Sequence, residues 1–291
     1  MNVLSSSPSV AVITSTIGRP ELERAIVSVQ QQSYPATHYV FVDGEQHWER
    51  AKAILAKYPN VVATYLPMNT GANGWTNSSI NAIAPYLVKA DIICYLDDDN
   101  WYEPQHILSG VQALQATGAD YAYALRNMYD ENQQFICIDT FESLGHYERG
   151  WQSSFSYNIL TDTHRHAFEL DVANEQHIDT NCYFVQHKIA KMLSQTWHTG
   201  HKNDYNVFQW LKRHATGVCT AQISVNYVVD LNKSMGKFLE RIQQKPINAT
   251  PEKARQVGWQ VLKQMSQTSI DGWGGQLIWQ TQHQQNPQNQ G

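Results

Sequence analysis

Short, mainly apolar runs alternate with segments of helical periodicity over about the first 120 residues. The runs predict buried strands, and they occupy residues 10–13, 39–42, 61–66 and 92–96. Between them, apolar residues recur every three or four positions, which predicts helices over residues 21–32, 48–58, 77–88 and 104–116. Repeated strand–helix units indicate an α/β fold with a mostly parallel sheet that is covered by helices on both faces.

The pattern changes beyond residue 120. Two apolar segments, residues 121–125 and 135–138, flank a polar turn and predict a hairpin. Residues 141–175 contain many aromatic residues and histidines but show no period, which predicts a loop-rich excursion over a site. Strands are further predicted at residues 182–185 and 222–229, and helices over residues 204–214 and 250–267. The Gln/Asn-rich tail after Trp279 is typical of disorder.

Composition excludes several classes of protein. Of the 291 residues, 42% are hydrophobic, which is enough to build a large core and excludes wholesale disorder. The formal net charge is −5 and no block of Lys and Arg occurs, so a nucleic-acid partner is not expected. The four cysteines form no CxxC pair, which predicts reduced thiols, with Cys94 as a small core residue.

Targeting signals and common enzyme motifs are also missing from the sequence. Residues 1–9 lack the basic start and apolar core of a secretory signal, and no apolar stretch is long enough to span a membrane. We therefore expect a cytoplasmic protein. No GxGxxG follows the first strand, and no GxxxxGK[ST], HExxH or GxSxG motif is present.

An acidic triplet, Asp97-Asp98-Asp99, closes the fourth predicted strand. Ligands of open α/β sheets bind beyond the carboxyl ends of strands, where Thr14 and Asp43 are also expected. Alternate residues of an extended chain share a face, so Asp97 and Asp99 point the same way. Two carboxylates suit Mg²⁺ or Mn²⁺ when substrate phosphates supply the other ligands. The alternative is an acidic turn that begins the next helix.

Four segments resemble, in the same order, the motifs of family 2 glycosyltransferases of the GT-A fold. They are VITSTIGRPEL with SVQQQSYP (residues 12–22 and 28–35), VFVDG (40–44), MNTGANGW (68–75) and YLDDDNWYEP (95–104). The last segment is similar to the strand end that carries the family's DXD motif. The resemblance covers about residues 8–115 well and extends loosely to about residue 230. It implies a Rossmann-like GT-A sheet flanked by helices, followed by a helical C-terminal extension.

The resemblance implies roles at a donor site. Asp43 is similar to the acid that binds the nucleotide base, and Thr14 lies at the edge of the same pocket. Asp97 is similar to the ribose contact, and Asp98 takes the variable middle position of the motif. Asp99 resembles the metal ligand that bridges to the diphosphate, with Mn²⁺ or Mg²⁺ as the cofactor.

Gly71, Asn73 and Asn81 complete the implied donor-binding set. The first two lie in the loop before the third helix, and Asn81 lies inside that helix. Many relatives carry Arg-Asn where this chain has Ile80-Asn81. The missing guanidinium removes one expected diphosphate contact, so more of the phosphate charge falls to the metal.

An inverting transferase also needs a carboxylate that takes the proton of the acceptor hydroxyl. In the family this acid precedes a helix well beyond the DXD motif, and Asn203-Asp204 resembles that pattern. A role of Asp204 as a helix cap is the alternative, and both roles are compatible. Asp179 is the competing candidate, because its segment looks like the family's acceptor-side loop.

The implied function is the metal-dependent, inverting transfer of a sugar from a nucleotide-sugar donor, with UDP as the expected nucleotide. The acceptor is a hydroxyl of a glycan or of a lipid-linked precursor in surface polysaccharide synthesis, with peripheral contact at the inner face of the membrane. A sugar nucleotidyltransferase and a noncatalytic glycan-binding domain are the alternatives.

The expected GT-A domain spans residues 1–235. Its nucleotide-binding half covers about residues 8–120 and its acceptor half about residues 121–235. Residues 236–291 form the expected C-terminal helical extension and a disordered, Gln-rich tail.

Overall fold

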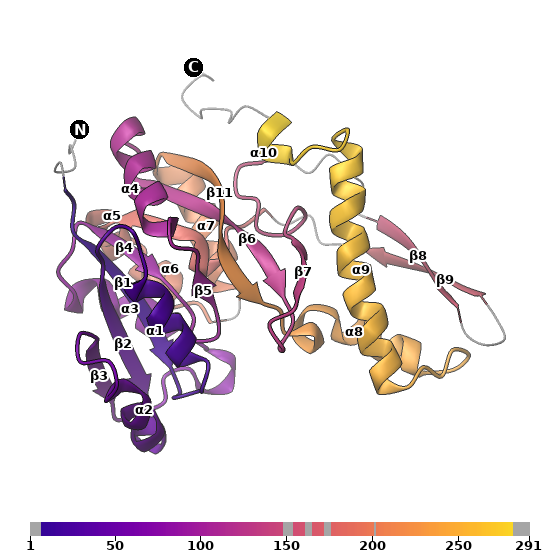
Figure 1. Cartoon of the computed structure of the whole chain (residues 1–291), viewed down its shortest axis with the longest axis horizontal. Helices are drawn as coiled ribbons and strands as arrows, with labels where there is room; N and C mark the ends of the chain where they lie inside the picture. The colour runs from indigo at the N-terminus through magenta and orange to yellow at the C-terminus, as the bar shows by residue number, and fades with distance from the viewer. Residues whose placement is uncertain (1–6, 148–153, 161–164, 172–175, 201, 282–291) are drawn as a thin grey trace.

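The computed structural model describes residues 7–147, 154–160, 165–171, 176–200 and 202–281 (Figure 1). Its strands are β1 (Val10–Thr16), β2 (Thr37–Asp43), β3 (Val62–Leu66), β4 (Ile92–Tyr95), β5 (Trp101–Tyr102), β6 (Tyr121–Tyr129), β7 (Phe135–Ile138), β8 (Ser154–Leu160), β9 (Arg165–Asp171), β10 (Tyr183–Gln186) and β11 (Gly217–Val228). Its α-helices are α1 (Leu22–Gln30), α2 (Trp48–Leu55), α3 (Ser78–Leu87), α4 (His106–Thr117), α5 (His187–Met192), α6 (Ser194–Trp197), α7 (Asn203–His214), α8 (Leu231–Gln243), α9 (Pro251–Gly272) and α10 (Ile278–Thr281).

One large sheet organises the fold, with the strand order β3-β2-β1-β4-β10-β6-β11-β5, and β7 pairs with β6. β1 to β4 run parallel to one another, as do β6 and β11, whereas β10 is antiparallel to both of its neighbours. α1 and α4 lie on one face of the sheet, and α3, α6 and α7 lie on the other (Figure 1). The predicted α/β class, with a largely parallel sheet flanked by helices, is confirmed.

Burial on both faces explains why the strands are apolar throughout. All four residues of β4 are buried, and Cys94 among them is a core residue, as expected. The predicted helix over residues 104–116 is confirmed as α4, which ends at Gly118 in the left-handed conformation with φ of 67°. Glycine favours this conformation because it has no Cβ atom to clash with the preceding turn.

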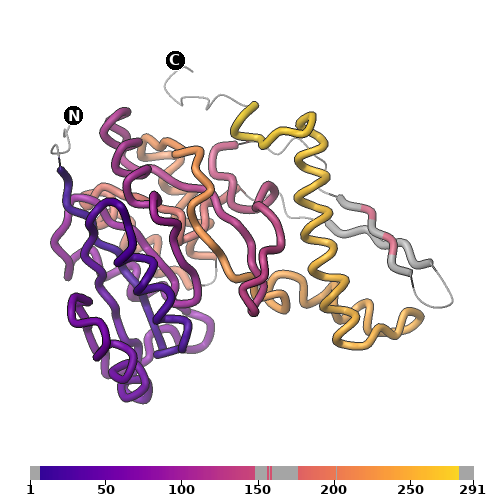
Figure 2. The backbone as a smooth tube through the Cα atoms, in the orientation of Figure 1, coloured from indigo at the N-terminus to yellow at the C-terminus, as the bar shows by residue number. Residues whose placement is uncertain are grey.

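A second core forms where the C-terminal helices meet the hairpin of β6 and β7. α8 and α9 pack against each other, and their apolar side chains surround Met128, Ile136 and Cys137. In the backbone trace, α9 runs beside β7 (Figure 2), and α9 also contacts β8. The helical C-terminal extension is thus part of the packed structure.

Three expectations about elements need correction. The stretch 141–175 was expected to be loop-rich, but its described residues include the antiparallel pair β8 and β9. The strand expected at residues 222–229 begins already at Gly217, because it pairs with the whole of β6. α8 was not predicted, although Asp230 caps it through the amides of Asn232 and Lys233.

The tail expected to be disordered falls largely on residues 282–291, outside the described residues. None of the described helices combines the length and the apolar content that a membrane crossing requires.

We predict that acid destabilises the fold through His38, which is buried in β2 with its Nε2 atom 2.8 Å from the hydroxyl of Thr14. Burial lowers the pKa of His38 to about 3, whereas an unfolded histidine titrates near about 6.5. Below about pH 6.5, His38 binds a proton in the unfolded chain but stays neutral in the folded chain. The contribution of His38 to the free energy of unfolding therefore falls as the pH falls, by about 1.4 kcal/mol per pH unit.

Urea unfolding between about pH 7 and about pH 5 measures this slope. His38→Gln should reduce the slope of unfolding free energy against pH by about 1.4 kcal/mol per pH unit. His214→Gln, at an exposed position of α7, is the matched control and should leave the slope unchanged. An unaltered slope in His38→Gln would contradict the prediction.

Candidate functional site

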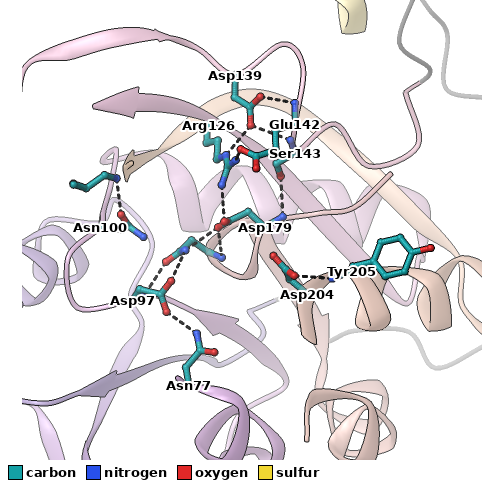
Figure 3. A network of polar contacts seen from close by, with 12 residues as sticks. Asn77, Asp97, Asn100, Arg126, Asp139, Glu142, Ser143, Asp179, Asp204 and Tyr205 are labelled. Atoms are coloured by element: carbon teal, nitrogen blue, oxygen red, sulfur yellow. Dashed lines mark hydrogen bonds and ion pairs between the residues drawn. The ribbon is translucent and has the colours of Figure 1, made fainter. Parts of the chain in front are cut away.

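Asp97 joins the two halves of the sheet. Its carboxylate accepts hydrogen bonds from Asn77 Nδ2 at 2.7 Å and from Asn181 Nδ2 at 2.9 Å, and its amide donates to Asn181 Oδ1 at 2.6 Å (Figure 3). Burial, together with the charges of Asp99 and Asp179, raises the pKa of Asp97 to about 7. The predicted ribose contact is therefore a half-buried carboxylate held in place by two amide side chains.

Asp98 and Asp99 are both paired with Arg19, which lies in the loop after β1. The Asp99 Oδ2 atom is 2.9 Å from Arg19 Nη1, and Asp98 Oδ2 accepts a hydrogen bond from the Thr16 hydroxyl at 2.5 Å. Asp98 is only 1% exposed, so its predicted donor contact is not supported: its carboxylate fastens the loop. Asp99 keeps 29% of its side chain exposed. Burial raises its pKa, which the Arg19 charge opposes.

Asp43 ends β2 as predicted, but it is occupied by the protein itself. One carboxylate oxygen accepts from the amide and the hydroxyl of Thr70, at 2.8 and 2.9 Å, and the other accepts from the amide of Gly71 at 2.8 Å. Gly71 tolerates no side chain, because a Cβ atom there would lie 2.2 Å from Thr76 O. Asn73 is exposed on the short turn that follows, with a left-handed φ of 57°. Asp43 thus fixes the predicted donor loop.

Two predicted donor-binding residues point into the protein. β1 continues to Thr16, so Thr14 does not end its strand, and its fully buried hydroxyl binds His38. Asn81 is 2% exposed inside α3, and its amide nitrogen has no hydrogen-bond partner among the described residues. The preceding Ile80 is a core residue. The expectation that Thr14 ends its strand is therefore corrected, and its role at the edge of the donor pocket stays a prediction.

Arg126, which sequence analysis missed, is buried on β6 among three carboxylates (Figure 3). Its guanidinium lies 2.7 Å from Asp139, 2.5 Å from Asp179 and 2.5 Å from Glu142. It also stacks over the ring of Tyr227, 4.1 Å from the centroid. The one available signal was a single charged residue within a mainly apolar strand, because a buried charge requires partners.

Asp179, the competing candidate for the base, has both oxygens engaged. Oδ2 pairs with Arg126, and Oδ1 accepts from the amide of Asn181 at 2.9 Å and from its Nδ2 at 2.7 Å. The side chain of Asp179 is therefore held between Arg126 and Asn181, and Asn181 in turn binds Asp97. Asn181, which also escaped prediction, links the two aspartates.

The C-terminal helix α9 supports this arrangement from outside the sheet. Ser266 donates to the carbonyl of Ile138 at 2.8 Å, and Ser269 donates to the carbonyl of Thr140 at 2.9 Å. The segment between these carbonyls carries Asp139, a partner of Arg126. The C-terminal extension thus reaches the site through backbone hydrogen bonds.

Asp204, the predicted base, lies half-buried in the first turn of α7. The residue before the helix is Lys202, so the alternative of Asp204 as helix cap is wrong. Its Oδ1 accepts from the amide of Tyr205 at 2.8 Å, and no other hydrogen bond of its carboxylate occurs among the described residues. Asn203 ties α7 to α3, since its Nδ2 donates to Asn77 Oδ1 at 3.2 Å and to Ser78 Oγ at 2.9 Å.

These contacts make one continuous chain across the molecule. Its members, in order, are Asp204, Asn203, Asn77, Asp97, Asn181, Asp179 and Arg126. The structure thus brings together Asp97, Asp179 and Asp204 from the predicted set.

The carboxylate oxygens at the end of β4 have the chemistry that a hard divalent cation prefers. Within the part of the chain that the structure describes, no three His, Cys, Asp or Glu side chains gather as a complete metal site. A cation held here would need further oxygen ligands, which a diphosphate can supply. The residues therefore fit a site that is completed by the substrate.

The comparisons with known proteins agree with the fold and the motifs. Residues 9–168, more than half of the chain, match the profile of glycosyl transferase family 2. The chain belongs to this family and is a glycosyltransferase.

Solved structures of Staphylococcus aureus TarS are similar in fold. The crystal structure of TarS 1–349 matches with a TM-score of 0.54 at 11% identity, covering 91% of this chain and 74% of TarS. The same protein in complex with UDP matches with a TM-score of 0.54, covering 90% and 73%. This likeness confirms the predicted GT-A fold, and at such low identity it shows the fold alone.

A sequence relative comes from Haemophilus influenzae. This uncharacterized protein is 29% identical over 100 residues, which are 34% of this chain and 66% of the relative. The chain therefore spans just under two thirds of the length of this relative.

We predict that Arg126→Met lowers the free energy of unfolding by about 3–5 kcal/mol, because it leaves buried carboxylates without their counter-charge. Urea unfolding measures the loss. Arg255→Met is the matched control, since Arg255 pairs with Glu131 at the surface, and it should cost about 1 kcal/mol or less. A loss for Arg126→Met as small as that of the control would contradict the prediction.

Proposed function

We propose that the protein transfers a sugar from a nucleotide-sugar donor, with UDP as the nucleotide, to an acceptor hydroxyl with inversion. The observation that carries the proposal is the half-buried Asp97 at the carboxyl end of β4, next to the loop that Asp43 fixes. Ligands of such sheets bind at these strand ends. Family membership and the UDP complex of a protein with the same fold support the choice of donor.

The donor would contact residues at the ends of β2 and β4. We assign the ribose contact to Asp97, and Gly71 and Asn73 lie in the loop next to the proposed base pocket at Asp43. We assign the nucleotide-binding half to about residues 8–120 and the acceptor half to about residues 121–235. The extension beyond residue 235 supports the acceptor half through α9.

Asp99 is the residue that would hold Mn²⁺ or Mg²⁺ together with the diphosphate of the donor. Such an ion neutralises the negative charge that the leaving nucleoside diphosphate gains as the glycosidic bond breaks. Arg19 already balances Asp98 and Asp99, so a cation at Asp99 has to compete with its guanidinium. Arg19 also supplies a positive charge on the donor side, where Ile80 cannot.

Asp204 is the better placed of the two base candidates. One of its oxygens has no hydrogen-bond partner among the described residues, whereas both oxygens of Asp179 are engaged. A base must offer a free lone pair to the acceptor hydroxyl. Asp179 then acts as the fixed partner that holds Asn181 against Asp97.

The acceptor that we propose is a glycan or a lipid-linked precursor in surface polysaccharide synthesis. It would approach from the side of α7, where Asp204 lies. The acceptor hydroxyl gives its proton to Asp204 while its oxygen attacks the anomeric carbon, and the bond to the diphosphate breaks on the opposite face.

We predict that UDP raises the melting temperature of the wild-type protein and that Mn²⁺ increases this shift. At about a hundredfold excess of ligand over Kd the stabilisation is about 2.7 kcal/mol. Asp99→Asn should lose the increase due to Mn²⁺, while the control Asp271→Asn, an exposed acid of α9, should keep it. The same measurement with GDP and dTDP tests the choice of uracil as the nucleotide base. An undiminished Mn²⁺ effect in Asp99→Asn would show that Asp99 is not the metal ligand.

We predict that Asp204→Asn lowers turnover by about 10²–10⁴-fold, because it removes general base catalysis. UDP binding should stay the same, since Asp204 is not a donor contact. The release of UDP from UDP-sugars, with water as the acceptor, is the assay. Full turnover in Asp204→Asn together with loss in Asp179→Asn would transfer the base role to Asp179.

A further inference from the structure

Large apolar side chains gather on the outer surface of α3 and its neighbours. Met68, Ile83, Tyr86, Leu87 and Met192 are each more than half exposed to solvent. We refer to these five residues as the α3 face. Ile83, Tyr86 and Leu87 are spaced as i, i+3 and i+4, so one side of α3 presents a continuous apolar stripe to solvent.

The α3 face is continuous across three elements. A cavity of about 770 Å³ lies between α3, α6 and the loop after β3, and Met68, Ile83 and Tyr86 contribute to its lining. Tyr86 also joins α3 to α5, because its hydroxyl donates to the carbonyl of Lys191 at 3.0 Å, next to Met192. An exposed apolar surface of this kind marks an interaction site rather than scattered surface residues.

The segments that form the α3 face carry basic residues and no acidic ones. Lys89, Lys188 and Lys191 lie at its rim, and residues 68–90 and 187–203 contain no Asp or Glu, although the whole chain has a net charge of −5. Lys188 is 3.5 Å from Asp120, and Lys191 lies 5.7 Å from the ring centroid of Tyr86. An apolar centre with a basic rim on an acidic protein is complementary to an anionic surface.

The residue types favour a lipid surface over a protein partner. Tyrosine and methionine occur at the centres of protein interfaces as well, but such interfaces are depleted in lysine, and three lysines flank the α3 face. Apolar side chains with flanking lysines are typical of surfaces that enter the headgroup region of anionic bilayers, where long lysine side chains reach the phosphates.

We propose that the α3 face is a membrane-docking surface for anionic lipid. Ile83, Tyr86 and Leu87 enter the headgroup region, and the rim lysines contact lipid phosphates. The inference deepens the proposed function and rests on it in one respect, the lipid-linked acceptor. The residue before α3, Asn77, binds Asp97, so a docked α3 holds the site within about 15 Å of the bilayer, one helix length.

The test is sedimentation of the full chain with vesicles of phosphatidylcholine alone or mixed equally with phosphatidylglycerol. We expect the wild type to bind the mixed vesicles and to be released by high salt. The variant Ile83→Ser/Tyr86→Ser/Leu87→Ser should lower the partition coefficient by about tenfold or more. Lys188→Gln/Lys191→Gln should lose the preference for phosphatidylglycerol. Val62→Ser/Phe135→Ser, at exposed apolar residues of β3 and β7, is the matched control.

Circular dichroism and the shift caused by UDP show whether each variant is folded. Equal binding by the wild type and the α3 variant, or no binding by the wild type, overturns the inference. A concentration-dependent dimer that the α3 variant abolishes also overturns it, because the face would then bind a second copy. Vesicle binding without any nucleotide shift refutes the proposed donor alone, whereas a UDP shift without vesicle binding refutes the docking surface alone.

Discussion

The hydrogen bonds that meet at Asp97 are the constraint on which the site depends. A half-buried carboxylate at the end of β4 is stabilised because Asn77, from the proposed donor half, and Asn181, from the proposed acceptor half, both donate to it. Neither half can shift without stretching one of these bonds. The same two amides lead on to Asn203 and to Asp179, so the separation between the proposed donor contact and the two acceptor-side acids is set by one network.

Local pattern was sufficient to predict most of the sheet and its helices. β1 to β4 are short apolar runs between amphipathic helices, so residues close in sequence determine them. β8 and β9 have no such pattern, and α8 owes its position to packing on α9. The acidic triplet was visible, but its pairing with Arg19 joins residues 80 positions apart. Arg126 and Asn181 were missed for the same reason, since their partners are brought together by the strand order.

Charge is distributed differently on the two sides of the site. On the donor side, one half-exposed arginine balances Asp98 and Asp99, and a negatively charged ligand with its cation can change that balance. On the acceptor side, Arg126 is buried among Asp139, Asp179 and Glu142, which fixes it permanently. The exposed Arg19 arrangement suits a substrate-binding site, and the buried Arg126 arrangement suits a fixed structural support.

The bonds from Ser266 and Ser269 to the backbone around Asp139 bear on how this enzyme can be divided or recombined. Sequence similarity to the family ends near residue 168, yet the helix that steadies the acceptor-side acids begins at Pro251. A hybrid that exchanges the first part of the chain alone would pair the hairpin that carries Arg126 with a C-terminal helix from another protein. The hairpin of β6 and β7 and the helix α9 are therefore one structural unit, which a hybrid has to keep together.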